Sequence, residues 1–196
     1  MPIFPTPQCV VSNGETVTVP RQALHVRAAL AGPALTVIER VFGPLPAAGS
    51  GPALTIGLAD EPALAGLPTP AQPQGYYLRA DGDGIVIAGR DLAGCFYGAQ
   101  TLAQIVRADD AAVHYPAVEN RDWPAFQQRG LYIEDFWGTD RMSIADYAEL
   151  IERCAALKLN TLIIGLFGGW EIKHHGQLSE FLMIPLRRHP ELQTPQ

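Results

Sequence analysis

Two adjacent acids, Glu134 and Asp135, are the most obvious candidates for acid–base chemistry in this sequence. They lie in a run rich in β-branched and aromatic residues, Gly130 to Trp137, which is typical of a strand. Successive side chains of a strand point to opposite faces of a sheet, so only one of the two carboxylates can face a given site. Adjacency alone therefore does not make them a cooperating catalytic pair.

The histidines, serines and cysteines indicate no further chemistry. His174 and His175 are adjacent, so they cannot share a helix face at the four-residue spacing that zinc needs, and no H-E-x-x-H motif is present. The serines lack the context of a nucleophile elbow. Cys9, Cys95 and Cys154 are far apart and without metal-ligand spacing, which favours free buried thiols. We expect neither a metal nor a cofactor.

The acids belong to a stretch, 121–170, that predicts a strand, a helix and a second strand. Ser143 followed by Asp146 is typical of a helix start. Thr161 to Phe167 is almost continuously apolar, as expected of a parallel strand covered on both faces. The pattern predicts a right-handed βαβ unit. Its helix should bury Ile144, Tyr147, Ala148, Ile151 and Ala155 and leave Glu149, Glu152, Arg153 and Lys158 for water.

The first 120 residues predict a mixture of short strands and helices. Asn13-Gly14 indicates a hairpin, and Gln22 to Leu30 a helix, whereas the spacing in Ala34 to Phe42 fits either a helix or a strand. Two loops rich in Pro and Gly flank a short buried strand, and Asp91 caps a helix that reaches about Arg107. The expected loops are Gly43 to Pro52 and Ala63 to Gly75, and the expected strands are Ala53 to Leu58, Tyr76 to Ala80 and Gly84 to Ala88. The last two are joined by Asp81-Gly82-Asp83, which predicts a hairpin.

Two motifs in this sequence resemble a known family. The segment from Gly75 to Val106, GYYLRADGDGIVIAGRDLAGCFYGAQTLAQIV, resembles the small zincin-like α/β domain that precedes the barrel of family 20 glycoside hydrolases, the β-N-acetylhexosaminidases. The later stretch resembles the first βαβ unit of that barrel, while Glu134 to Gly138 is also similar to family 84 N-acetylglucosaminidases, and this stretch does not separate the two families. The barrel match rests on Asp122, Pro124, Phe126, Arg129, Gly130, Glu134, Lys158, Leu159, Asn160, Gly169, Trp170 and Ile172.

The resemblance implies an α+β zincin-like domain over residues 1–120 and, over 121–196, the start of an incomplete (β/α)₈ TIM barrel. It also implies retaining hydrolysis of terminal N-acetylhexosamine in which the substrate's acetamide is the nucleophile. The family's catalytic Asp-Glu pair comes from the fourth barrel strand, and a whole barrel needs about 250 residues. We therefore expect an N-terminal part of such an enzyme, from a split gene, an early stop or a deliberate fragment, with no catalytic residue of its own. The alternative is a non-catalytic module that binds a carbohydrate or a protein.

The resemblance makes Arg129, Glu134, Trp137 and Trp170 the candidate substrate-binding residues. Arg129 matches an arginine that binds hydroxyls of the terminal sugar through its fork of donors, although pairing with Glu134 or another core acid is equally expected. The two tryptophans have the amphipathic rings that stack on sugars, and core packing explains them as well. The polar residues that the family carries before the tryptophan are replaced here by Gly165 to Gly169.

Composition limits the partners. A net charge of −6 and a pI near 5.3 leave no basic patch for nucleic acid or an anionic membrane, so the expected ligand is a glycan containing N-acetylhexosamine. The N-terminus shows no secretory signal, which predicts a cytoplasmic protein. The open pair of parallel strands predicts a partner chain or self-association that completes the barrel.

Overall fold

The computed structural model describes residues 3–28, 32–133, 142–164, 172–174 and 177–179. The chain forms two compact units, Met1–Arg129 with Ala155–Lys158, and Gly130–Cys154 with Leu159–Gln196. No helix in the described ranges has the length and apolar character needed to span a membrane.

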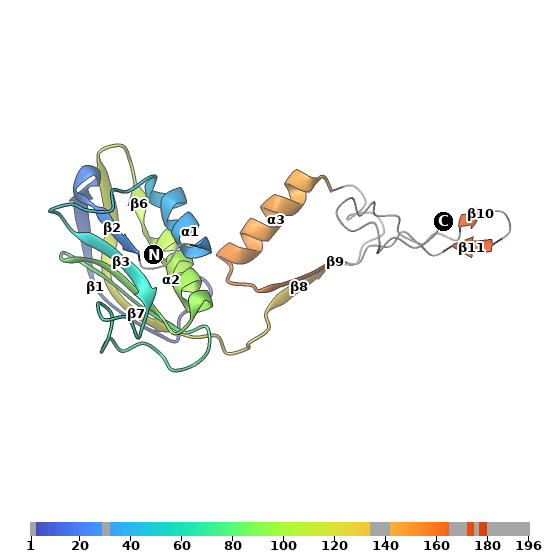
Figure 1. The fold of residues 1–196 in the computed structure, drawn as a ribbon, viewed down its shortest axis with the longest axis horizontal. Helices are drawn as coiled ribbons and strands as arrows, with labels where there is room; N and C mark the ends of the chain where they lie inside the picture. Colours follow the sequence, from blue (N-terminus) through green and yellow to red (C-terminus); the bar gives the residue numbers. More distant parts are fainter. Residues whose placement is uncertain (1–2, 29–31, 134–141, 165–171, 175–176, 180–196) are drawn as a thin grey trace. The chain divides into compact units, whose positions relative to one another are not determined.

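The first unit is built on a mixed seven-stranded sheet in the order β1-β7-β4-β5-β3-β2, with β6 paired to β7 (Figure 1). The strands β2, β3 and β5 run parallel, and β4 is antiparallel to both of its neighbours. The strand bounds are β1 Cys9–Pro20, β2 His25–Ala28, β3 Ala53–Leu58, β4 Tyr76–Asp81, β5 Gly84–Gly89, β6 Arg107–Ala108 and β7 Ala112–Asp122.

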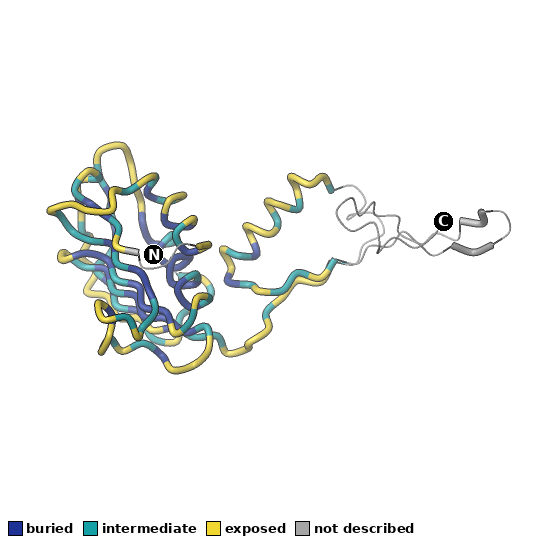
Figure 2. The backbone as a smooth tube through the Cα atoms, viewed as in Figure 1, coloured by how far each residue is buried: buried dark blue, intermediate teal, exposed yellow. Residues whose placement is uncertain are grey.

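Two helices, α1 (Pro33–Phe42) and α2 (Leu92–Ile105), cover one face of this sheet (Figure 1). The strands alternate as a half-covered sheet requires. Leu78 of β4 and Ile87 of β5 are buried in the core under the helices, whereas Tyr77 and Ala88 point the other way and pack on Leu64 of the 59–75 loop. Figure 2 shows the buried residues concentrated in this sheet and in the helices on it. The main core therefore lies under the two helices, and the 59–75 loop covers a small part of the other face.

Helix α2 begins where the sequence predicts and lies very close to the sheet. The Asp91 carboxylate accepts the backbone N–H of Gly94 at 2.8 Å through Oδ1, which is an N-cap bond. A Cβ at Gly94 would lie 2.1 Å from the carbonyl oxygen of Gly75, and a Cβ at Gly98 2.5 Å from Ile87. Glycine at both positions is what permits this close approach.

Two predictions for the N-terminal region are wrong. Asn13-Gly14 does not form a hairpin, because β1 is one strand whose two halves both pair with β7, with a shift in register between Ser12 and Thr16. Asn13 and Gly14 lie within this register shift, and Gly14 adopts a φ of 81° there. The predicted helix from Gln22 is instead a 3₁₀ turn, η1 (Arg21–Ala23), followed by β2, because parallel pairing with β3 overrides the local helical pattern.

The second unit contains the predicted βαβ unit. Strands β8 (Gly130–Ile133) and β9 (Thr161–Ile164) pair in parallel and are joined through α3 (Ile144–Ala156), whose last residues, 155–156, belong to the first unit. The predicted strand ends at Trp137 and Phe167 lie outside the described residues. A short antiparallel pair follows, β10 (Ile172–His174) and β11 (Gln177–Ser179).

The start of α3 is a reciprocal capping box. The backbone N–H of Ser143 donates to Asp146 Oδ2 at 2.7 Å, and the N–H of Asp146 donates to Ser143 Oγ at 3.3 Å. The predicted buried stripe is wrong, since Ile144 is 89% exposed and Ile151 55% exposed. The described residues of this unit do not cover that face. The expectation of a solvated Lys158 is also wrong, because this lysine is 5% exposed.

Candidate functional site

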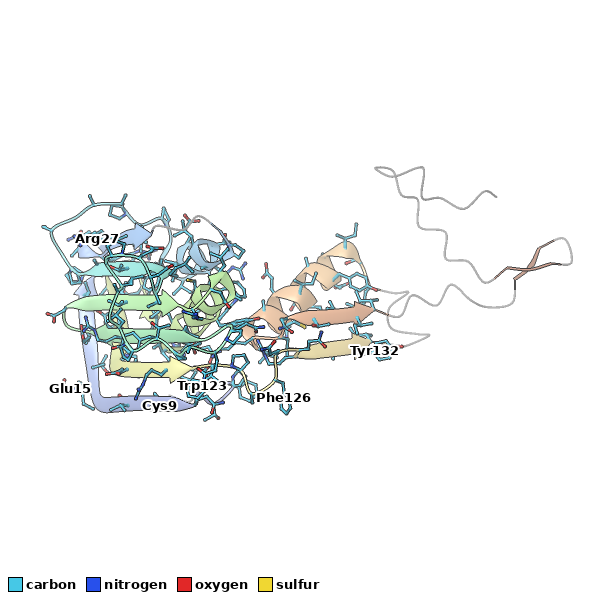
Figure 3. The ribbon with its side chains drawn as sticks, turned by 60° about the horizontal axis from the view of Figure 1, so that its bottom comes forward. Cys9, Glu15, Arg27, Trp123, Phe126 and Tyr132 are labelled. Carbon is cyan, nitrogen blue, oxygen red and sulfur yellow. The ribbon has the colours of Figure 1, made fainter. Side chains whose placement is uncertain are left out.

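A pocket of about 240 Å³ lies within the first unit, at the end of β7 and beside the first turns of α2. Its wall includes Trp123 and Phe126, which Figure 3 labels on the segment that follows β7. The side chain of Phe126 is 75% exposed, so an aromatic face is open to solvent at this pocket. The complete lining is Pro5, Thr6, Gln8, Gln74, Tyr76, Tyr97, Asp122, Trp123, Pro124, Ala125, Phe126, Arg129 and Lys158.

Arg129 is held in this pocket from several sides. Its Nε donates to the backbone carbonyl of Lys158 at 2.9 Å, and its Nη1 to that of Phe126 at 2.7 Å. Its Nη2 donates to Gln74 Oε1 at 3.0 Å, and the guanidinium carbon lies 5.1 Å from the centre of the Tyr97 ring, a cation–π distance. The planar fork of donors is thus fixed in one orientation.

The floor of the pocket is a buried ion pair between Asp122 and Lys158. Lys158 Nζ lies 2.9 Å from Asp122 Oδ2, and it also donates to the Tyr76 hydroxyl at 2.9 Å. That hydroxyl donates to the same Asp122 oxygen at 3.0 Å and lies 2.6 Å from the Thr101 hydroxyl, while Asp122 Oδ1 accepts the backbone N–H of Gln8 at 3.2 Å. Removing one charge would leave the other buried without its partner.

Burial controls the ionisation of this network. It lowers the pKa of Lys158, an effect opposed by the negative charge of Asp122. It raises the pKa of Tyr76 well above its usual value, and the Asp122 charge acts in the same direction. The tyrosine therefore stays protonated at neutral pH and serves as a hydrogen-bond donor to the carboxylate.

The pocket brings Lys158 together with three motif residues that lie about 30 positions earlier in the sequence. These are Asp122, Phe126 and Arg129, and all four line the pocket. Of the four candidate substrate-binding residues, Arg129 lies there, while Glu134, Trp137 and Trp170 lie outside the described residues. The contribution of Tyr97 was not predicted. The opposite charges of Asp122 and Lys158, which both belong to the barrel motif, were the available signal for the ion pair.

The three cysteines are free thiols, as expected. Cys95 and Cys154 are also buried as expected, whereas Cys9 is partly exposed. The Cys95 thiol donates to the carbonyl of Gly57 at 3.1 Å, and burial raises its pKa to about 11, so it is unreactive at neutral pH. Over the described ranges, no cluster of three or more His, Cys, Asp or Glu side chains is arranged to hold a metal.

Comparison with known families identifies the class to which the first unit belongs. Residues 1–123 match the model of glycosyl hydrolase family 20, domain 2, and the chain therefore belongs to this family. It is 33% identical over 122 residues to a beta-hexosaminidase of Porphyromonas gingivalis, and 30% identical over 111 residues to the N,N'-diacetylchitobiase of Vibrio harveyi. These matches cover 57% and 54% of this chain but 15% and 12% of the relatives, so the chain spans a small part of their length.

Solved structures share the fold over most of the chain. The structure of CpGH84B matches with a TM-score of 0.69 and 23% identity, over 82% of this chain and 29% of that one. A family 20 exo-β-N-acetylglucosaminidase from Vibrio harveyi matches with a TM-score of 0.65 and 21% identity, over 85% of this chain and 25% of that one. The family model that shows family 20 covers residues 1–123 and does not extend over the segment from Glu134 to Gly138.

Proposed function

We propose that this chain supplies the zincin-like domain and the beginning of the catalytic barrel of a β-N-acetylhexosaminidase. The observation that carries the proposal is the family 20 domain 2 match over residues 1–123, followed directly by the parallel β8–α3–β9 unit. A parallel strand pair with a helical crossover is the repeating unit of a TIM barrel. The resemblance of the sequence 122–172 to the first such unit of the family supports the same assignment.

In this proposal the chemistry is retaining hydrolysis, with the substrate's own acetamide oxygen as the nucleophile. This differs from the usual scheme with two enzyme carboxylates. The family's Asp-Glu pair, which orients the acetamide and protonates the leaving group, lies outside these 196 residues. The present residues then contribute substrate binding and the scaffold of the site.

Arg129 is the residue of the pocket that we assign to the sugar. Its guanidinium has a fixed orientation and lies among aromatic side chains, a combination that suits hydroxyl groups on a sugar ring. Glu134, Trp137 and Trp170 complete the proposed substrate-binding set. The glycan to which they bind contains N-acetylhexosamine.

A second candidate, a non-catalytic carbohydrate-binding module, is favoured by one observation. Phe126 is 75% exposed beside the partly exposed Trp123 at the same pocket, and exposed aromatic faces are a means of binding sugar rings without catalysis. This candidate predicts that the purified chain binds N-acetylglucosamine and that Phe126→Ala abolishes the binding. It also predicts that the downstream gene segment encodes no Asp-Glu pair.

The test of the main proposal uses the DNA that follows the codon for Gln196. We expect coding sequence for a third barrel strand and, beyond it, an Asp-Glu pair. The 196-residue chain alone should not hydrolyse a chromogenic N-acetyl-β-glucosaminide, and the chain produced together with the downstream segment should do so. Hydrolysis by the chain alone, or no hydrolysis by the combined protein, contradicts the proposal. Arg129→Ala in the combined protein tests the sugar contact separately.

The exposed apolar residues of the second unit lead to a proposal about partners. Tyr132 of β8 and Ile163 of β9 are 56% and 53% exposed, and Ile144 of α3 is 89% exposed. We propose that further barrel strands and helices pack against these exposed residues, and that a partner chain or another copy of this chain supplies them. Size-exclusion chromatography of the isolated chain should then show oligomers, and a clean monomer that binds no apolar dye would contradict this assignment.

A further inference from the structure

Lys158 combines two features that a lysine at the end of a helix does not ordinarily have. Its side chain is 7% exposed, and its backbone φ is 58°, in the left-handed region. Its N–H donates to the carbonyl of Ala155, and the next N–H, of Leu159, donates to the carbonyl of Cys154. This is the Schellman arrangement, in which the left-handed position usually holds glycine because a Cβ is unfavourable there. The lysine side chain must therefore contribute something that glycine would not.

That contribution is the ion pair with Asp122. Asp122 is the last residue of β7 and is 8% exposed. Its carboxylate also accepts hydrogen bonds from the Tyr76 hydroxyl and from the backbone N–H of Gln8. The carboxylate is thus anchored to the core independently of Lys158. The ammonium group is fixed to this anchor at 2.9 Å, which restrains the backbone of Lys158 as well as its side chain.

The backbone of Lys158 in turn contacts Arg129. The carbonyl of Lys158 accepts the Nε–H of Arg129 at 2.9 Å. Because Nε lies at the base of the guanidinium, this bond sets the plane in which the two Nη groups extend. Tyr97 and Gln74 complete the setting, with the ring under the guanidinium and the amide oxygen at Nη2.

We propose that Asp122 and Lys158 form a positioning pair for Arg129. The buried ion pair holds Lys158 in its left-handed conformation, and the carbonyl so placed orients the guanidinium in the pocket. The inference deepens the proposed function, because it rests on Arg129 as the residue that contacts sugar. Lys158 and Asp122 act through Arg129 in this proposal and are therefore positioning residues.

The test measures the order of the Arg129 side chain in the intact 196-residue chain. The hydrogen exchange of the Arg129 Nε–H is followed by ¹⁵N NMR in the parent, Asp122→Asn and Lys158→Gly. The control is the guanidinium of Arg21, whose Nη1 donates to the backbone carbonyl of Asp109 at 3.0 Å in the same unit, so the exchange of its Nη–H groups is followed. We expect Arg129 exchange to accelerate about tenfold more than Arg21 exchange in both variants, as the loss of a restrained hydrogen bond implies.

Lys158→Gly separates positioning from a purely structural role. Glycine tolerates the left-handed conformation and still has a carbonyl group at this position, but it removes the ion pair that restrains the backbone there. If the side chain of Arg129 remains as protected as in the parent, or if Arg129 and Arg21 lose protection equally, the pair does not position Arg129 and the inference fails. The NMR result requires no activity. If the NMR result is as expected but Arg129→Ala leaves hydrolysis by the combined protein unchanged, the proposed contact of Arg129 with the sugar is wrong. The inference that Asp122 and Lys158 position Arg129 is then still supported.

Discussion

The described residues contain two parallel strand pairs with helical crossovers, and they differ in how well they are covered. In the first unit α1 connects β2 to β3 and buries Ala34, Val37, Ile38 and Phe42. In the second unit α3 connects β8 to β9, and Cys154 is its one buried side chain among the described residues. Both helices are amphipathic, so the difference does not come from their sequence patterns.

The number of neighbouring elements explains the difference. Helix α1 packs beside α2 over a seven-stranded sheet, so its apolar stripe and the strands beneath it lose water together. The described part of the second unit offers α3 a sheet of two strands, β8 and β9. An isolated two-stranded sheet is marginally stable in water. An apolar pattern thus predicts which face is to be buried, while the surrounding elements decide whether it is buried.

The largest expected contrast between the two regions is in amide hydrogen exchange. The N–H groups of β5, such as those of Ile85 and Ile87, should exchange only on global unfolding, because this strand is central and buried. Those of β9 should exchange through local opening. We expect at least about a thousandfold difference in protection, measured by NMR or mass spectrometry. Similar protection in β5 and β9 would show that the second unit is covered in solution.

A matched pair of truncations should show the same contrast in stability. Leu78 in β4 is fully buried, and Leu78→Ala is expected to lower the free energy of unfolding by about 2–5 kcal/mol. Ile163 in β9 is 53% exposed, and Ile163→Ala should cost less than about 1 kcal/mol. Urea denaturation followed by circular dichroism measures both. A cost for Ile163→Ala equal to that for Leu78→Ala would contradict the comparison.

The same contrast explains which parts of the fold can be predicted from sequence. The β4–β5 hairpin, α2 with its Asp91 cap and the capping box at Ser143 are determined by residues close in the chain, and these predictions are confirmed. The failures at Asn13-Gly14 and at the helix expected from Gln22 come from pairing with β7 and β3, which are far away in sequence. Local patterns contain no record of such partners.

The candidate site divides in the same way. Arg129, a residue of the pocket, could be selected from the sequence because the motif that contains it is one short continuous segment. The burial of Lys158 was not predicted, because a lysine after a helix is ordinarily solvated and its partner Asp122 lies 36 positions earlier. Only the folded chain shows that these charges meet.

The two helix caps should differ by a smaller amount. Asp91 accepts backbone N–H groups from both Gly94 and Gln74, each at 2.8 Å, so it fixes α2 and also the preceding loop. Asp91→Ala should cost about 1–2 kcal/mol, and Ser143→Ala at the start of α3 about 0.5–1 kcal/mol. Thermal denaturation measures both, with Asp91→Asn as the control that retains one acceptor oxygen. Equal costs would mean that the second bond to Gln74 adds nothing.

The smallest expected effect is the acid titration of two exposed aspartates, one in each region. Backbone N–H groups of Ala112 and Ala111 lower the pKa of Asp109, and bonds from the N–H and hydroxyl of Ser143 lower that of Asp146, in each case below the usual 3.8. A carboxyl whose pKa is lower in the folded state stabilises that state above the unfolded pKa and loses this effect as the pH falls through the folded pKa.

Carboxyl ¹³C titration should therefore place both midpoints below 3.8, and helix α3 should weaken only as Asp146 becomes protonated. In Asp146→Asn the helical signal should already be reduced at neutral pH and should lack this acid step, whereas Asp109→Asn should leave α3 unchanged. The lowered pKa of Asp146 requires that the capping box persists in solution. A midpoint for Asp146 at or above 3.8, with Asp109 still lowered, would mean that α3 is frayed at its start while the first unit remains ordered.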